Sequence, residues 1–265
     1  MGRVIPGLIM AAVWLLLLLF GPFVLFWSVI VIGSWVGLYE YFRMTDRHLS
    51  GFRLWMLIFI GSFPVLASYF KTTEAVMAGL IAGLLGLVFL VLRLYTRIDD
   101  VFRFLSIGGL GILYVGLCTA HLVLLHALPD GAYWLIILTA MTAGSDTGAY
   151  YAGRAFGRKK LCPAISPGKT VAGGVGGIVA GILTVEIVSL ILPMSPSMVE
   201  IGLIAVVLVI IGIAGDLIES VIKRSMEVKD SGTLLGGHGG LLDRVDSLLL
   251  TAPVFYYLHY FNILA

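Results

Sequence analysis

Long apolar runs alternate with short polar segments along the whole chain. Nine such runs occur, near residues 4–20, 22–39, 54–70, 75–92, 104–126, 131–152, 171–193, 199–219 and 246–264. Each has about the 20 residues that a helix needs to cross the hydrocarbon core of a bilayer. Backbone N–H and C=O groups in lipid must form hydrogen bonds within the protein, which only helices and closed barrels allow. These runs are unlike the short alternating pattern of barrel strands. The pattern predicts an all-α polytopic membrane protein with nine transmembrane helices.

The composition supports this fold class. Hydrophobic residues make up 60% of the 265-residue chain, charged residues make up 12%, and the mean hydropathy is +1.06. These values lie far from those of soluble domains. We predict one integral membrane domain over residues 1–265, in which residues 1–126 are a mainly apolar helical scaffold and residues 127–265 carry the polar, functional segments.

The basic residues predict the orientation of the chain. With nine spans, all of the 17 Lys and Arg residues except Lys71 fall on one side of the membrane. The positive-inside rule assigns that side to the cytosol, so the N-terminus and both large polar loops are predicted to be cytoplasmic. We expect the first run to be a retained helix, because Gly21-Pro22-Phe23 offers no small-x-small cleavage site.

Cysteine usage and net charge indicate no further function. Cys118 lies in a predicted span and Cys162 in a cytosolic loop, an arrangement that permits neither a structural disulfide nor a four-ligand zinc site. The net charge is +2, and the bases are spread along the membrane surface, where they suit anionic lipid headgroups. Nucleic acid binding is not indicated.

The segment from Asp216 to Asp246 is unusually polar for this chain. Six acidic and four basic side chains surround the glycine-rich stretch 236–240. A phosphate compound would approach this acidic segment only if metal ions bridged the two, which indicates metal-assisted phosphate chemistry. Ionised carboxylates at the ends of spans, including Asp146 and Glu219, cost a few kcal/mol unless paired, hydrated or metal-bound, and are therefore functional candidates.

Helical spacing brings several of these polar residues together. Four of them recur at i, i+3, i+4 and i+7, on one stripe of a helix that continues past the bilayer: Asp216, Glu219, Ser220 and Lys223. Asp243 and Asp246 share a face at the start of the ninth helix, where helix capping is the alternative to metal binding. His238, between pairs of glycines, is predicted to be an exposed imidazole that contacts a phosphate or shuttles a proton.

A second polar stretch, over residues 145–177, is basic. Its bases follow Asp146, and Ser166-Pro167-Gly168-Lys169-Thr170 leads into a run of glycines. Glycines let backbone N–H groups approach a phosphate, and a helix beginning after Thr170 would add its positive end, which predicts a polyphosphate cradle. The alternative is that the bases follow the positive-inside rule and the glycines pack helices closely. It is not a P-loop, because Pro163 stands where the first glycine of that motif belongs.

The polar positions at fixed spacing carry a family resemblance. They are Ser220, Lys223, Arg224, Lys229, Asp230, Gly232, His238, Gly239, Gly240, Asp243, Arg244 and Asp246. This run resembles the phosphatidate cytidylyltransferase signature, and so do the segments around Asp216 and Lys169. The resemblance extends weakly through the first four helices and strongly from Asp146 to Asp246. Ala172, where an acidic or amide residue is common, and Gly236, where Pro is usual, depart from the family pattern.

The resemblance implies transfer of a cytidylyl group from CTP to phosphatidate, giving CDP-diacylglycerol and pyrophosphate. We expect Mg²⁺ as cofactor, held by Asp216, Asp243 and Asp246, with a second metal ion left open. The predicted catalytic residues are Lys223, Arg224, Lys229, Asp230, His238 and Arg244. The predicted substrate-binding residues are Asp146, Ser166, Lys169, Thr170, Ser220, Gly239 and Gly240. The expected location is a bacterial inner membrane, with the site facing the cytosol.

Two alternatives and one open question accompany this prediction. A related membrane transferase or kinase could act on an isoprenoid phosphate or a lipid alcohol. A transporter would be expected to show charges near the midplane and two similar halves, and the sequence shows neither. The expected partners are CTP, phosphatidate and membrane lipid, whereas a homodimer is common for such a fold and stays open.

Overall fold

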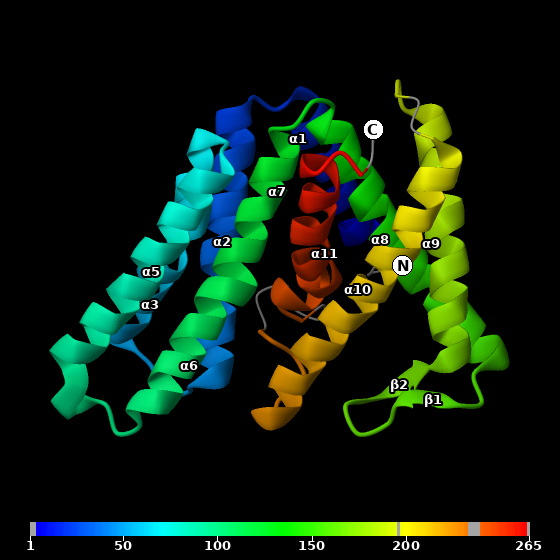
Figure 1. Cartoon of the computed structure of the whole chain (residues 1–265). Coiled ribbons are helices and arrows are strands. Elements are labelled where there is room, and N and C mark those ends of the chain that lie inside the picture. The colour runs from blue at the N-terminus through cyan, green and yellow to red at the C-terminus, as the bar shows by residue number, and fades with distance from the viewer. Residues whose placement is uncertain (1–3, 195–196, 233–238, 264–265) are drawn as a thin grey trace.

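The chain folds into a bundle of long helices with one small hairpin at its lower end (Figure 1). The computed structural model describes residues 4–194, 197–232 and 239–263. The first half contains α1 Val4–Phe20, α2 Phe23–Thr45, α3 Gly51–Gly61, α4 Phe63–Ala67, η1 Ser68–Phe70, α5 Thr73–Leu94, η2 Tyr95–Arg97, α6 Val101–Gly111, η3 Ile112–Leu117 and α7 Cys118–His126. The second half contains α8 Gly131–Phe156, β1 Lys160–Cys162, β2 Ser166–Thr170, α9 Val171–Ile191, α10 Met198–Ser225 and α11 Leu242–Tyr260.

A helix or pair of helices lies at each of the nine predicted apolar runs. Within the described residues, five helical stretches are long and apolar enough to cross a membrane: Phe23–Thr45, Thr73–Arg97, Val101–His126, Val171–Ile191 and Met198–Ser225. A sixth span is formed if the pair Gly51–Gly61 and Phe63–Phe70, bent by 40°, crosses as one. The protein is therefore a helical membrane protein. The nine predicted crossings exceed this number by three. α1 has only 17 residues, polar residues dilute the apolar character of α8, and charged residues occupy the first turns of α11.

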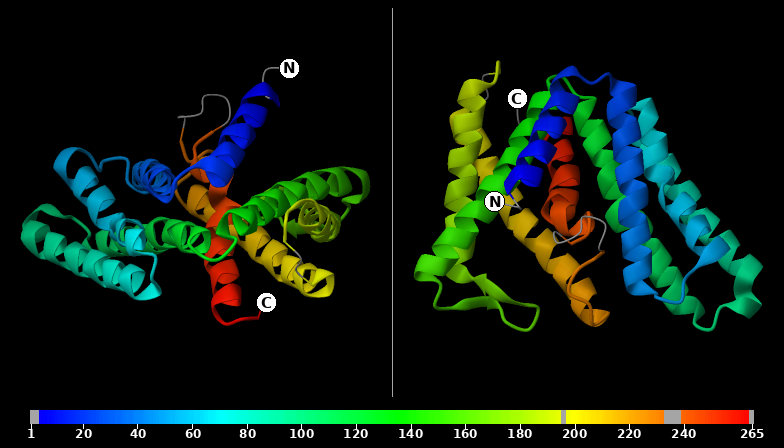
Figure 2. Two further views of the ribbon diagram at one scale, coloured as in Figure 1. Left: turned by 90° about the horizontal axis from the view of Figure 1, so that it is seen from above. Right: turned by 180° about the vertical axis from the view of Figure 1, so that it is seen from behind.

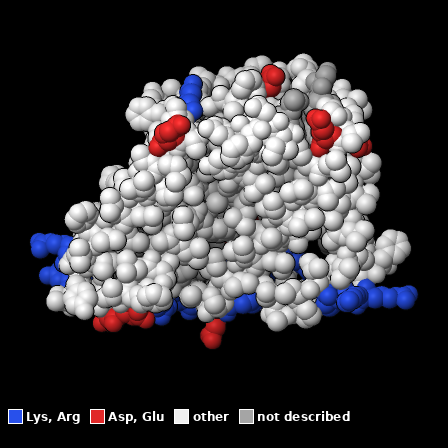
Figure 3. Space-filling model, in the orientation of Figure 1, with Lys and Arg blue, Asp and Glu red and all other residues white. Residues whose placement is uncertain are grey.

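The outer surface of the bundle suits contact with lipid. Large apolar side chains are exposed around it, including Phe20, Phe89 and Ile191, which a soluble protein would bury. Basic side chains gather along the lower edge (Figure 3), where the segments after α2 and α5 and the hairpin lie (Figure 1). This separation of apolar sides from a basic end is the one that the positive-inside rule predicts.

The helices form two groups around a central pair. Seen from above, α2, α3 and α5 lie on one side and α8, α9 and α10 on the other, with α7 and α11 between them (Figure 2). α11 packs against both α7 and α10. It begins near the middle of the molecule's height rather than at the lower edge (Figure 1). The chain after α10 therefore returns into the bundle, and the polar first turn of α11 lies inside it.

The two strands were not predicted and form the exception to an all-helical fold. β1 and β2 pair antiparallel, with Lys160 opposite Thr170 and Cys162 opposite Ser166. The predicted start of a helix after Thr170 is confirmed, because its hydroxyl accepts a hydrogen bond from the Gly173 amide at 3.0 Å and caps α9. The last residue of β2, Thr170, therefore directly precedes the first residue of α9.

Close approach of α8 and α9 explains several of the glycines. A Cβ atom added at Gly148 would collide with Ala180, and one added at Gly176 would collide with Ala152. Small residues allow such contact between membrane helices, so the packing interpretation of the glycine run holds at these positions. Gly174 differs, because no atom lies within 4 Å of an added Cβ there.

Candidate active site

A cavity of about 480 Å³ lies at the lower end of the molecule, between α8, the hairpin, the start of α9 and α10. Its charged lining consists of Asp146, Arg154, Lys160, Lys169 and Asp216. The volume falls in the range typical of small-molecule sites, which is about 300–1,000 Å³. The cavity thus combines bases from the predicted phosphate cradle with carboxylates from two helices.

One ion pair joins the two polar segments that the sequence singles out. The ammonium group of Lys169, in β2, lies 2.5 Å from Oδ2 of Asp216, in α10. Ser220, one turn later in α10, donates to the other carboxylate oxygen of Asp216 at 3.3 Å. Arg224 adds a second link, because its Nε donates to the carbonyl of Ile165 at 3.4 Å. The basic hairpin is therefore held against the acidic helix.

A second charged cluster lies on the same face of α10. Lys223 Nζ is 2.9 Å from Oε2 of Glu219 and 2.7 Å from Oδ1 of Asp243. The predicted stripe is confirmed, because the contacts of Ser220 with Asp216 and of Lys223 with Glu219 both span four residues. Glu219 is fully buried; its Oε1 accepts from no N–H or O–H group of the described residues, and the carboxyl of Asp246 lies close enough to share a proton with it. A buried carboxylate oxygen without a partner is costly unless a cation or proton satisfies it.

Asp243 organises the polar turn that precedes α11. Its Oδ2 accepts from the backbone amide of Ser231 at 2.9 Å, from the hydroxyl of Ser231 at 3.0 Å and from the amide of Gly240 at 2.8 Å. Burial alone would raise the pKa of Asp243, but the hydrogen bonds from Lys223, Gly240 and Ser231 outweigh it and hold the pKa below its ordinary value. Asp243 therefore holds the segment before α11 and forms an ion pair with Lys223, rather than capping amides of α11 itself.

Glycine is required beside Asp243. Gly239 has a φ of +79°, and an added Cβ would lie 2.7 Å from Oδ2 of Asp243. The left-handed backbone and the nearby carboxylate both disfavour a side chain there. The Gly239-Gly240 pair thus allows the chain to wrap closely around a carboxylate.

The carboxylates of three helices face one another near the cavity. Asp246, in the first turns of α11, lies within electrostatic range of Asp216, Glu219 and Asp146. Its Oδ1 also accepts from the amide of Ser247 at 2.6 Å. Among the described residues, no three His, Cys, Asp or Glu side chains are arranged as a ready-made metal site. Mg²⁺ commonly takes only one or two carboxylates and completes its shell with water and substrate phosphates, so this oxygen donor set fits that ion.

Most of the other predicted site residues lie outside the lining of the cavity. Thr170 and Lys169 line the cavity, whereas Ser166 lies at the far end of the hairpin pairing, opposite Cys162. Lys229 and Asp230 are exposed in the segment after α10, and Arg244 is exposed in the first turn of α11. The prediction for His238 falls outside the described residues.

Some residues near the site were not named individually in the prediction, although two of them lie in the predicted phosphate cradle. Arg154 and Lys160 line the cavity, and Arg154 donates to the hydroxyl of Tyr150 at 3.2 Å. Their signal was ambiguous, since the positive-inside rule explains any base in that loop. Glu40, near the end of α2, was also missed, although it contacts the Asp243 turn. A lone acid after an apolar run gives no indication of a partner about 200 positions away.

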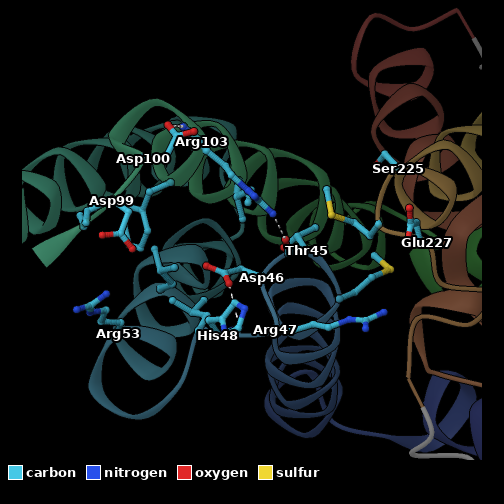
Figure 4. Close-up of a pocket in the computed structure, with 17 residues that line it drawn as sticks. Thr45, Asp46, Arg47, His48, Arg53, Asp99, Asp100, Arg103, Ser225 and Glu227 are labelled. Carbon is cyan, nitrogen blue, oxygen red and sulfur yellow. Dashed lines mark hydrogen bonds between the residues drawn. The ribbon is translucent and has the colours of Figure 1, made fainter.

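A second cavity, of about 540 Å³, lies between the ends of α2, α3, α6 and α10 (Figure 4). Acidic and basic side chains are mixed on its rim, and several are engaged by the protein itself. Asp46 accepts from the amide of His48 at 3.0 Å, and Arg103 donates to the carbonyl of Thr45 at 3.3 Å. Because no predicted site residue lines it, we place the candidate active site in the first cavity.

Comparisons with known proteins identify the family and several relatives of this chain. The model of the cytidylyltransferase family matches residues 1–262. A phosphatidate cytidylyltransferase of Bacillus subtilis is 37% identical over 174 residues, which cover 64% of this chain and 65% of the relative. A phosphatidate cytidylyltransferase of Pseudomonas aeruginosa is 38% identical over 148 residues, covering 56% and 55% of the two chains. The uncharacterized protein YnbB of Escherichia coli is 46% identical over 133 residues, covering 49% and 43%. The matched stretches thus span less than two thirds of each relative.

Proposed function

This chain belongs to the cytidylyltransferase family, and on that premise we propose that it transfers a cytidylyl group from CTP to phosphatidate. The products are CDP-diacylglycerol and pyrophosphate. The observation that carries the proposal is the ion pair of Lys169 with Asp216, which brings the basic hairpin and the acidic end of α10 to one cavity. Relatives named phosphatidate cytidylyltransferase support the same reaction.

The reaction joins two anions. A phosphate oxygen of phosphatidate attacks the α-phosphorus of CTP, the bond from that phosphorus to the bridging oxygen of the β-phosphate breaks, and pyrophosphate leaves with the bonding electrons. Because the attacking phosphate is an anion and negative charge develops on the leaving pyrophosphate, catalysis needs cations around both groups more than it needs a strong base. Arg154, Lys160 and Lys169 supply such cations in the cavity, and Lys223 and Arg224 supply them along α10.

We assign Mg²⁺ to the carboxylates at this site. Asp216, Asp243 and Asp246 would hold the ion, and a second ion could share the same donors. When bound, the metal neutralises phosphate oxygens and orients the CTP chain. In the chain itself, lysine ammonium groups pair with Asp216 and Asp243. Both carboxylates therefore already bind a cation of the chain, and Asp216 does so in the lining of the cavity.

The remaining predicted residues have supporting roles in this proposal. Ser220 orients Asp216, and Thr170 fixes the start of α9 beside the cavity. Gly239 and Gly240 shape the turn around Asp243. Ser166, Lys229, Asp230, His238 and Arg244 keep their assignment from the family resemblance, and Asp146 contributes a carboxylate to the cavity lining.

For the membrane topology we propose nine crossings, with the N-terminus and the site in the cytosol and the chain in a bacterial inner membrane. The support is the distribution of basic residues, which all lie on one side except Lys71. Phosphatidate would enter sideways from the bilayer, keeping its acyl chains in hydrocarbon while its phosphate reaches the charged cavity. Such entry requires no soluble lipid carrier.

A panel of acceptors tests the proposed substrate. The purified full chain in detergent would be given CTP and Mg²⁺ with phosphatidate, an isoprenoid phosphate or diacylglycerol, and the lipid products would be identified by mass. We expect a CDP-lipid with phosphatidate only. A nucleotide-linked or phosphorylated product with another acceptor, and none with phosphatidate, would assign the site to a different lipid. The Asp216→Asn variant serves as the inactive control.

A further inference from the structure

Glu40 of α2 reaches across the bundle to the start of α11. Its side chain is buried, with only 4% of the residue's surface exposed. Oε1 accepts from the amide of Leu241 at 3.0 Å, and Oε2 accepts from the amide of Leu242 at 3.0 Å. These are N-terminal helix amides, which have no partner within their own helix. Leu241 occupies the N-cap position and has no side-chain oxygen to cap with, so a distant helix supplies the cap.

The same carboxylate is linked to the Asp243 turn through one hydroxyl. Ser231 Oγ lies 3.4 Å from Oε2 of Glu40 and 3.0 Å from Oδ2 of Asp243. Asp243 in turn accepts from Lys223 at 2.7 Å. A continuous network therefore runs from α2, through the segment that precedes α11, to the charged face of α10.

The backbone around Glu40 is shaped to receive it. A Cβ atom added at Gly232 would lie 2.6 Å from Oε1 of Glu40, and one added at Gly240 would lie 2.6 Å from Oε2. Both glycines are thus needed for the chain to approach the carboxylate. A negative charge at a helix N-terminus is also favourable electrostatically, which offsets part of the cost of burying Glu40.

We propose that Glu40 is a positioning residue for the reaction. It holds Ser231 and the first residues of α11, Leu241 and Leu242, against α2 and thereby fixes Asp243 and Lys223 at the site. This gives the apolar first half of the chain a defined part in catalysis. The inference rests on the proposed function only for its effect on turnover, because the contact between Glu40 and the amides of α11 is independent of the substrate.

The test uses Glu40→Gln in the full chain. The amide keeps the length of the side chain, but its NH₂ group cannot accept from the second backbone amide. We expect faster deuterium exchange in the peptide that contains Leu241 and Leu242, with exchange in α8 and α9 unchanged. We also expect kcat for CDP-diacylglycerol formation to fall on the order of 100-fold, the effect of a small misplacement of reacting groups. KM for CTP should stay within about threefold, because the cavity bases are untouched.

Two further variants complete the test. Glu200→Gln changes an exposed acid in the first turn of α10, at the opposite end of the molecule, and should alter neither exchange nor kcat. Ser231→Ala removes only the shared hydroxyl and provides a milder variant should Glu40→Gln fail to fold; kcat should again fall with KM unchanged. Normal kcat in a folded Glu40→Gln or Ser231→Ala protein would overturn the proposal, as would unchanged exchange at Leu241 and Leu242. A wild-type protein without activity would overturn the proposed function instead, and the exchange measurement would still decide whether Glu40 holds the segment.

Discussion

Lys169 and Asp216 lie 47 positions apart in the sequence, yet their charged groups form an ion pair 2.5 Å long. The contact joins the last residues of the hairpin to the C-terminal half of α10. It encloses a cavity in which bases from one segment face carboxylates from another. Phosphate chemistry needs both kinds of group, since the bases bind phosphate oxygens and the carboxylates bind the metal ions that bridge to them.

Lys169→Gln should weaken CTP use without unfolding the protein. The change removes a cation from the cavity and leaves Asp216 without its ion pair, while the hydroxyl of Ser220 still bonds that carboxylate. We expect kcat/KM for CTP to fall about 100-fold, as for loss of one preorganised group. Arg97→Gln, at an exposed base in η2, is the matched control. Equal kcat/KM values for the two variants would exclude Lys169 from the site.

Asp216→Asn and Asp243→Asn should each abolish turnover. Loss of a metal-binding carboxylate removes several kcal/mol of charge stabilisation, which corresponds to about 1,000-fold or more in rate. Both variants should insert and purify normally, since an Asn oxygen can still accept from Ser220 at position 216 and from the amides of Ser231 and Gly240 at position 243. Asp99→Asn, at an exposed residue between η2 and α6, is the control. Near wild-type turnover in either variant, measured across a Mg²⁺ titration, would remove that residue from the metal ligands.

Gly176→Ala should destabilise the protein, and Gly174→Ala should not. The new methyl group at position 176 collides with Ala152 across the α8–α9 contact, whereas position 174 has open space. Overpacking of this kind costs about 1–3 kcal/mol. Thermal unfolding of the two purified variants compares them directly. Equal midpoints would mean that α8 and α9 do not pack as closely as described.

Cysteine labelling should establish the topology. In a background of Cys118→Ser and Cys162→Ser, new cysteines at Gly2 and Lys229 should react with an impermeant maleimide only in inside-out vesicles. A cysteine at Asn262, after α11, should react only in cells whose outer membrane has been permeabilised and whose inner membrane is intact. Reaction of Gly2→Cys from the outside would mean that α1 does not cross the membrane. The number of crossings would then be eight rather than the proposed nine.

Much of the helical architecture is predictable because each apolar run specifies its own helix. The stripe on α10 is predictable for the same reason, since Ser220 and Lys223 contact residues four positions earlier. Other local features escape prediction. The bend at Ser62 and the π-helical stretch η3 interrupt runs that are uniformly apolar, and the strands at 160–170 are too short and too rich in Pro, Gly and Lys to show an alternating pattern.

Contacts between distant segments could not be predicted. Sequence spacing placed Asp243 near a helix start but left capping and metal binding as alternatives, and it gave no signal for Glu40. The structure shows why: the turn around Asp243 is completed by Ser231, Gly240 and an acid from α2. Such a network depends on how α11 returns into the bundle, which no local pattern specifies.

The most direct test of the proposed activity follows the phosphorus atoms of CTP. The purified protein would be incubated with phosphatidate, Mg²⁺ and CTP labelled either at the α-phosphate or at the γ-phosphate. We predict that α-label enters the lipid, that γ-label leaves as pyrophosphate, and that neither occurs without Mg²⁺. Transfer of γ-label to the lipid would show a kinase, and an unlabelled lipid with folded protein would contradict cytidylyl transfer to phosphatidate.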